Sequence, residues 1–205
     1  HIRHSEKVFI MKRLLLILIL MFSFQSWTKA DGIREIQIEG ITIGDSIFKH
    51  IKRNDFDALQ KYTYFYPDKK FAVTVCKINS EITTEYDQIS CTYKVTSNDY
   101  KVYGISGGIK YDNNISSCLI KKNEIVKEFS EILTNTNKVD RGTYDHDADS
   151  TGNSFQTVVD FMFDDDSYVR VVCHDWSNKI TLEKKWYDEL KVYITSKELN
   201  YYINR

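Results

Sequence analysis

The segment RVVCHDWS, residues 170–177, places a thiol, an imidazole and a carboxylate side by side, and cysteine hydrolases use these three groups. Its alternation of side chains is typical of a β-strand, in which successive residues point to opposite faces of the sheet. Cys173 then shares a face with Val169 and Val171, whereas His174 lies on the other face. Because a catalytic thiol needs its base within hydrogen-bond reach, we expect Cys173 to be structural and the strand to hold no catalytic pair.

A second candidate nucleophile is Ser46, in the segment IGDSIF, which resembles the nucleophile block of the GDSL hydrolases. The resemblance covers only these few residues. The chain has no Gly-x-Asn-Asp block for an oxyanion hole, and no histidine has an Asp three places before it. Without a base the serine is an ordinary alcohol, so we expect Asp45 or Ser46 to cap a helix. The hydrolase hypothesis predicts His146 or His174 within hydrogen-bond distance of Ser46.

A third candidate is the acidic segment YDHDADSTGNS, in which Asp145, Asp147 and Asp149 alternate like the first ligands of a calcium loop. Hard oxygen ligands at alternate positions suit Ca²⁺. However, Gly152 comes two places late for the sharp turn of such a loop, and Gln156 stands where a bidentate Glu would close it. We therefore expect a solvated acidic loop, with no metal and no other cofactor. A calcium-dependent adaptor remains the alternative.

Residues 11–30, MKRLLLILILMFSFQSWTKA, combine a positive start, an apolar run of 11 residues and a polar exit. We interpret them as a secretory signal peptide cleaved before Asp31, because a membrane-spanning helix needs about 20 apolar residues. An uncleaved anchor is the alternative. Residues 1–10 are interpreted as an upstream leader, and residues 31–205 as one domain. The expected location is the periplasm or the exterior, with no stable membrane insertion after cleavage.

The four cysteines lie in the part of the chain that would be exported. An even number of cysteines in an exported chain favours disulfides. We expect Cys118 to pair with Cys173, because both lie on apolar faces of their elements. Cys76 would pair with Cys91 across a hairpin whose turn is centred at residues 83–84. Buried free thiols are the alternative for either pair.

The rest of the chain supplies the elements that must position these groups. Alternating β-branched and aromatic residues predict strands, and a period near 3.6 predicts helices. The expected strands are 35–39, 71–78, 85–96, 100–111, 155–163, 168–176 and 190–195, and the expected helices are 46–62, 116–133, 181–188 and 197–204. A long polar loop is expected at 134–154.

Short polar links between neighbouring strands indicate hairpins. The expected fold class is therefore α+β: a mainly antiparallel sheet, built as a meander plus a second hairpin, with helices packed on one side in a single domain. GISGG, residues 104–108, lacks the spacing of a phosphate-binding loop and lies in a strand, so we expect close packing there. The sequence shows no cluster of tryptophans that would single out a carbohydrate site.

The charge of the chain argues against nucleic acid and anionic lipid as partners. Residues 1–30 hold five Lys or Arg and one Glu, so residues 31–205 carry 23 basic and 28 acidic side chains. This acidic balance argues against binding of nucleic acid or anionic lipid by bulk electrostatics.

Five segments, taken together and in order, resemble a group of small exported proteins from marine planktonic alphaproteobacteria: EIQIEGITIGDSIFKHI, GGIKYDNNISSCLIKKNEIVKEFSEI, HDADSTGNS, VRVVCHDWS and WYDELKVYITSKELNYYI. The resemblance spans about residues 33–203 and implies export and a common fold, without an activity. In this group the loop reads His-x-Ala-Asp-x-Ser/Thr-Gly, which has no counterpart of Asp145 or Asp147 and so argues against calcium. The group usually has Tyr at the position of His174, which implies a surface position on a strand.

The sequence thus favours a non-catalytic, exported binding or interaction module, with an envelope protein or a small ligand as its partner. The alternatives are the esterase-like hydrolase that would use Ser46 and the calcium-dependent exported adaptor.

Overall fold

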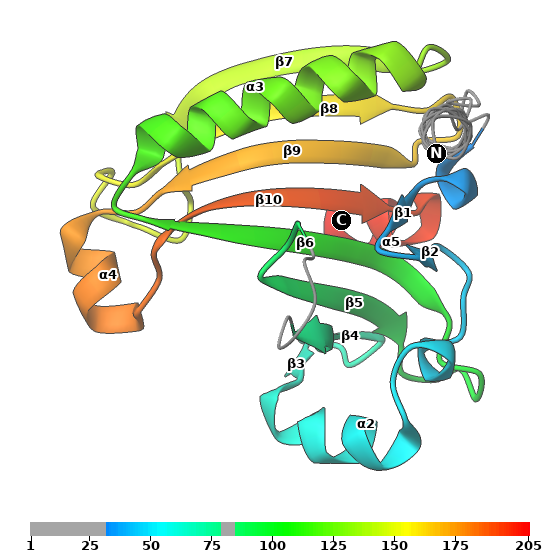
Figure 1. The fold of residues 1–205 in the computed structure, drawn as a ribbon. Helices are drawn as coiled ribbons and strands as arrows, with labels where there is room; N and C mark the ends of the chain where they lie inside the picture. Colours follow the sequence, from blue (N-terminus) through cyan, green and yellow to red (C-terminus); the bar gives the residue numbers. More distant parts are fainter. Residues whose placement is uncertain (1–31, 79–84) are drawn as a thin grey trace, which may run out of the picture.

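The structure is a computed structural model that describes residues 32–78 and 85–205 (Figure 1). The expected leader, signal peptide and hairpin turn at 83–84 lie outside these residues. The strands are β1 (Gln37–Ile38), β2 (Ile41–Thr42), β3 (Tyr64–Phe65), β4 (Phe71–Ile78), β5 (Gln88–Lys94), β6 (Val102–Asp112), β7 (Asn137–Asp145), β8 (Phe155–Met162), β9 (Tyr168–Asp175) and β10 (Asp188–Thr195). The helices are α2 (Arg53–Leu59), α3 (Ile115–Ile132), α4 (Asn178–Lys184) and α5 (Lys197–Ile203), with short 3-10 helices η1 (Ile33–Glu35), η2 (Ile47–Lys49) and η3 (Gln60–Tyr62).

Eight of these strands form one antiparallel sheet in the order β3-β4-β5-β6-β10-β9-β8-β7, and β1 pairs with β2 in a separate hairpin. The chain builds β3 to β6 as one meander, passes through α3, and builds β7 to β10 as a second meander. β10 then pairs with β6, which joins the two meanders into one sheet. The expected fold class, an α+β domain with a mainly antiparallel sheet and helices packed on one side, is confirmed.

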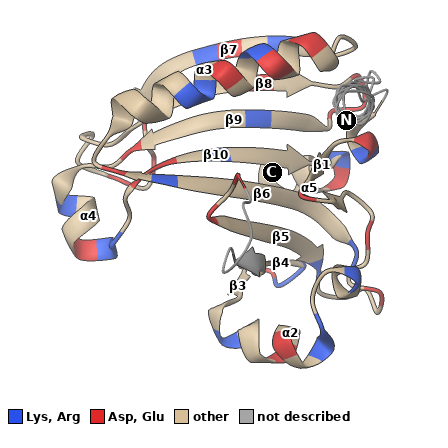
Figure 2. Ribbon diagram, viewed as in Figure 1, with Lys and Arg blue, Asp and Glu red and all other residues tan. Residues whose placement is uncertain are grey.

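The long helix α3 covers the middle of the sheet (Figure 1). It begins where the Oδ1 of Asn114 accepts a hydrogen bond from the backbone N–H of Ser117 at 3.1 Å, as in an ordinary helix cap. Its buried residues, Cys118 and Ile125 among them, pack mainly on β9 and β10, while charged residues of both signs lie along its length (Figure 2). None of the described helices combines the length and the apolar character that a membrane span requires.

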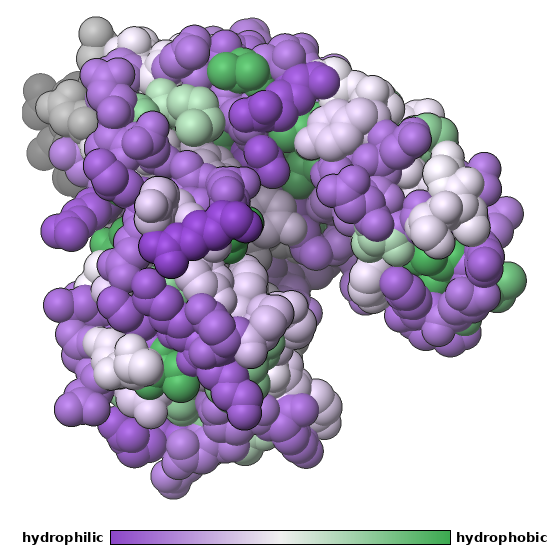
Figure 3. Space-filling view, turned by 180° about the vertical axis from the view of Figure 1, so that it is seen from behind, coloured by the Kyte–Doolittle hydropathy of each residue, from purple (hydrophilic) through white to green (hydrophobic). Residues whose placement is uncertain are grey.

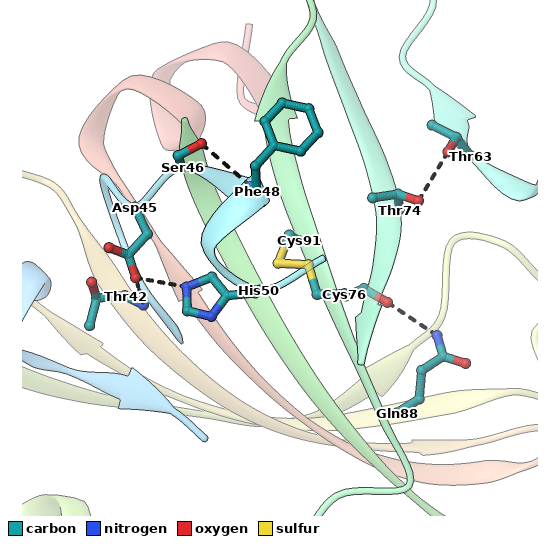
Figure 4. The surroundings of a disulfide bond; sticks show 11 residues. Thr42, Asp45, Ser46, Phe48, His50, Thr63, Thr74, Cys76, Gln88 and Cys91 are labelled. Carbon is teal, nitrogen blue, oxygen red and sulfur yellow. Dashed lines mark hydrogen bonds and ion pairs between the residues drawn. A yellow bond between two sulfur atoms is a disulfide. The ribbon is translucent and has the colours of Figure 1, made fainter. Parts of the chain in front are cut away.

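Two disulfides cross-link the core, with the expected pairs. Cys118 of α3 joins Cys173 of β9 with the Cα atoms 6.0 Å apart, and Cys76 of β4 joins Cys91 of β5 with the Cα atoms 5.7 Å apart (Figure 4). The register of the second pair differs from the expected one. Cys91 lies opposite Thr74, because the pairing shifts at Cys76 in the manner of a β-bulge. Two disulfides are typical of a protein that folds in an oxidising compartment.

The glycines of β6 pack closely, as expected. A β-carbon on Gly104 would lie 2.6 Å from Leu199 of α5, and one on Gly107 would lie 2.5 Å from the ring of Tyr86. The strand therefore requires glycine at these two positions because neighbouring side chains occupy the space.

β7 lies where the sequence analysis expected only a polar loop at 134–154, and that expectation is wrong. β7 is an edge strand that pairs with β8 alone, and almost all of its side chains are exposed. Because neither face of β7 is buried in the core, its sequence has no alternating apolar residues that a pattern analysis could detect.

The N-terminal region is also less regular than expected. The strand predicted at 35–39 is reduced to β1, preceded by η1, and the helix predicted at 46–62 is broken into η2, α2 and η3. The break has a simple cause. Phe56 follows Ile51 by five positions, a step that does not keep both residues on one helical face, and Lys52 between them is extended.

Candidate functional site

Cys173 and His174 point to opposite faces of the sheet, as the strand pattern predicted. Cys173 is buried in its disulfide on the α3 side. His174 lies on the other face but is only 7% exposed, so the implied surface position is wrong. The reason is local: the rings of His146 and Trp176 pack around it, with centroids 5.1 Å and 5.7 Å from its own.

Ser46 is a capping residue in this structure (Figure 4). Its Oγ accepts a hydrogen bond from the backbone N–H of Phe48 at 3.4 Å and donates one to the carbonyl of Asp99 at 3.0 Å. The nearby imidazole of His50 binds the carboxylate of Asp45 instead, with Nε2 2.9 Å from Oδ2. Within the described residues no histidine is hydrogen-bonded to Ser46, so the geometry that the hydrolase hypothesis predicted is not formed.

Asp149 is buried and holds its loop together. Its Oδ1 accepts hydrogen bonds from the backbone N–H and the hydroxyl of Thr151 at 3.0 and 2.6 Å. Its Oδ2 accepts from the hydroxyls of Ser154 and Ser177 at 2.7 and 2.9 Å. These hydrogen bonds hold the pKa of the carboxyl well below its usual range, and the bond from Ser154 has the largest effect.

The three aspartates that suggested calcium do not converge. Asp145 and Asp147 are exposed, whereas the carboxylate oxygens of Asp149 are engaged by hydroxyl and amide donors. In residues 32–78 and 85–205 no group of three or more His, Cys, Asp or Glu side chains is placed to hold a metal ion. The ligand role that the calcium alternative gave to Asp149 is therefore replaced by a structural one.

The Asp149 hydrogen bonds fix the loop 146–154 and thereby place His146. The backbone N–H of His146 donates to the carbonyl of Ser154 at 2.8 Å, and its Nδ1 accepts from the N–H of Ala148 at 3.1 Å. An imidazole whose Nδ1 accepts carries its proton on Nε2 when neutral. The ring lies 4.2 Å from the ring of Trp176, centroid to centroid.

These rings form one wall of a hollow of about 530 Å³ beside α4, on the sheet face opposite α3. We call it the tryptophan hollow. Figure 3, which views the molecule from behind, shows the surface hollowed between the lobe around α4 and the rest of the molecule. The lining residues are Gln88, Lys110, His146, Ala148, His174, Trp176, Lys185, Trp186, Tyr187, Glu189, Lys191 and Tyr193.

The segment that follows α4 supplies the second tryptophan. The Oγ of Ser177 accepts a hydrogen bond from the N–H of Ile180 at 3.4 Å and so starts the helix, and Lys185 ends it in the left-handed region at φ 59°. The chain then turns back toward β10 and brings the ring of Trp186 to 4.7 Å from that of Trp176. Trp186 is 40% exposed, so one of its faces is open to solvent.

Two buried nitrogens in this wall have no hydrogen-bond partner among the described residues. They are Nδ1 of His174 and Nε1 of Trp176, and the two residues are 7% and 8% exposed. A buried polar atom without a partner costs about 1–3 kcal/mol, and native proteins contain few of them. Both atoms therefore mark a place where the fold alone does not satisfy its own polar groups.

Two of the charged residues that line the hollow, Glu189 and Lys191, come from β10. Lys191 Nζ lies 2.6 Å from Glu189 Oε1, and the two side chains are 32% and 22% exposed. Although burial alone would lower it, Tyr193 and Glu189 raise the pKa of Lys191. Burial, with smaller effects from Lys191 and His146, lowers the pKa of His174 to about 3. Burial also lowers the pKa of His146, so both imidazoles are neutral at pH 7.

A smaller hollow of about 260 Å³ adjoins the first, because His174 and Tyr193 line both. Next to it the buried Asp160 accepts hydrogen bonds from Arg170 at 2.7 and 2.9 Å and from Arg141. These arginines outweigh the effect of burial and lower the pKa of Asp160. The pairing with the two arginines neutralises the charge of Asp160.

The sequence analysis missed this site, because Trp176 and Trp186 are ten positions apart and do not form a cluster in the sequence. One signal could have found them. A short helix predicted between two adjacent antiparallel strands brings the residues at its two ends close together. His146 was considered only as a base for Ser46, a role for which the structure gives no support.

The hollow combines aromatic faces, N–H donors and a charged lysine, and its lining residues include no serine, threonine or cysteine. This set of groups is suited to holding a ligand by stacking and hydrogen bonding. Comparison of the chain with known protein families, with curated proteins and with solved structures finds no match.

Proposed function

We propose that the protein is a non-catalytic, exported binding module that takes a small ligand in the tryptophan hollow. The observation that carries this proposal is the lining of the hollow, in which the aromatic side chains of Trp176, Trp186 and Tyr187 stand beside lysines around a volume of about 530 Å³. Aromatic and apolar walls with a small number of charged or polar groups are the usual lining of a small-ligand site.

Two further features support export and a binding role. The pattern of residues 11–30 is that of a signal peptide, and the two disulfides fit an oxidising compartment such as the periplasm. The hollow lies beside α4, on a sheet that both disulfides brace, so its walls are held largely in place before a ligand arrives. Preformed walls reduce the entropy that binding must overcome.

The test uses the full chain expressed with its leading segment and purified from the periplasm of a bacterial host. The indole N–H signals of Trp176 and Trp186 in ¹⁵N-edited NMR spectra, assigned with Trp176→Phe and Trp186→Phe variants, report directly on the hollow. The probes are millimolar neutral and acidic monosaccharides, amino acids and aromatic acids. We expect saturable shifts of both signals with at least one probe class, and recovery of the probe unchanged.

Two results would contradict the proposal. If no probe class shifts either indole signal, the hollow does not bind small ligands of these kinds. If the bound probe is recovered chemically altered at a rate above that of a buffer control, the module is catalytic.

A further inference from the structure

We propose that the ligand of the tryptophan hollow is a small carboxylate that carries a ring with an apolar face, such as an acidic sugar or an aromatic acid. This inference rests on the proposed function and adds the chemical class of the ligand. It follows from the charge of the lining residues, from the hydrogen-bond donors among them and from their aromatic side chains.

The charge of the lining is the first argument. Lys110, Lys185 and Lys191 face the hollow together with Glu189 as the one acidic lining residue, which leaves two positive charges in excess. The whole chain has a formal charge of −1, so this excess is local and opposite in sign to that of the protein. A positively lined concavity on an acidic protein attracts a small anion and does not attract a polyanion to the rest of the surface.

The second argument is that the hydrogen-bonding groups of the lining residues are mostly donors. The Nζ of Lys191 has three N–H groups, of which Glu189 engages one. The Nε2 of His146 is a donor in the neutral ring, since its Nδ1 accepts from Ala148. A carboxylate offers two oxygens with about four acceptor positions, which complements a site rich in donors.

The aromatic walls are the third argument. The rings of Trp176 and Trp186 lie 4.7 Å apart at an angle of 59°, and Tyr187 follows directly in the lining. Trp186 is 40% exposed and offers aromatic surface on which a ring can stack, while the buried Trp176 packs against it. A carboxylate without a ring would leave that surface in water, so the site favours a ligand that has both parts.

The position of Lys191 makes it the expected partner of the carboxylate. Its Cε lies 3.9 Å from the place that a β-carbon of Gly108 would occupy, so the lysine chain extends across a position without a side chain. Glu189 holds the ammonium from one side at 2.6 Å. The ammonium is thereby held at the lining of the hollow, with donors left over for an anion.

The experiment compares matched ligands that differ only in charge, followed by the indole signals of Trp176 and Trp186. Galacturonate is compared with galactose, phenylacetate with phenylacetamide, and inorganic phosphate serves as an anion without a ring. The two acids distinguish an acidic sugar from an aromatic acid as the source of the carboxylate. The variants are Lys191→Met, Glu189→Gln and, as a matched control, Lys179→Met, at an exposed lysine of α4 that is not among the lining residues.

We expect at least one acid to bind about tenfold or more tightly than its neutral counterpart, as one charge-assisted hydrogen bond allows. Lys191→Met should remove that advantage, Glu189→Gln should increase it by freeing the ammonium, and Lys179→Met should leave it unchanged. Melting temperatures of the variants show whether each remains folded.

The outcomes separate this inference from the proposed function. If the neutral ligands bind as tightly as the acids, or if Lys191→Met binds the acids as the parent protein does, the hollow is a binding site but the ligand class is wrong. If phosphate shifts the indole signals as strongly as the acids do, the ring is not required, which also overturns the inference. If neither these ligands nor the wider probe set shift the signals, the proposed function itself fails.

Discussion

The two disulfides close loops of different length, and this difference predicts how much each contributes to stability. Cys118–Cys173 spans 55 residues, whereas Cys76–Cys91 spans 15. In the chain-entropy description, a cross-link over 55 residues stabilises the folded state by about 4 kcal/mol and one over 15 residues by about 3 kcal/mol. The two loops do not overlap in the sequence, so each constrains its own part of the unfolded chain.

We therefore expect the double variant Cys118→Ala/Cys173→Ala to lose about 1 kcal/mol more stability than Cys76→Ala/Cys91→Ala. All four cysteines are at most 7% exposed, so the packing lost with the sulfur atoms is similar and largely cancels in the comparison. The assay is equilibrium unfolding in urea, followed by circular dichroism, with each variant extrapolated by its own slope. A larger loss from the short loop than from the long one would refute the reasoning, because packing or strain would then outweigh chain entropy.

Two further predictions concern single positions. Gly107→Ala should lower the free energy of unfolding by about 1–3 kcal/mol, because the new β-carbon would lie 2.5 Å from the ring of Tyr86, whereas Gly108→Ala has no neighbour closer than 3.9 Å. Equal losses in urea unfolding of the two variants would show that close packing is not the cause. His174 has a pKa of about 3 in the folded chain, so between about pH 6 and pH 4 the unfolded state binds a proton that the folded state does not. Lowering the pH over this range should therefore reduce the free energy of unfolding of the parent protein by about 1.4 kcal/mol per pH unit more than that of His174→Phe. Parallel pH profiles of the urea midpoints would contradict the burial of this imidazole.

The long buried elements were predictable from the sequence, since burial itself creates the pattern that was read. α3 has its apolar stripe because it covers a sheet, and β5 and β10 alternate because one side of each faces the core. The same analysis did not predict β7 or the short N-terminal helices. An exposed edge strand and short interrupted helices bury too few residues to produce a periodic pattern in the sequence.

The candidate site was less predictable, since it depends on distances between segments that no local pattern records. Asp149 illustrates this point. Its spacing from Asp145 and Asp147 suggested a metal, whereas its actual partners include Ser177, 28 positions away. The Asp149 hydrogen bonds then determine where His146 lies, and His146 in turn covers His174. Such a chain of dependence follows from tertiary packing and is visible only in the folded molecule.

The two ends of the eight-stranded sheet have a consequence for the protein in a crowded compartment. An open sheet invites another chain to add a strand along its free margin. On one side β3 is only two residues long, and on the other β7 carries Lys138, Asp140 and Arg141 and shifts register at Gly142, where φ is +68°. Each margin thus offers a short, charged or irregular template, which discourages the addition of a strand from another chain.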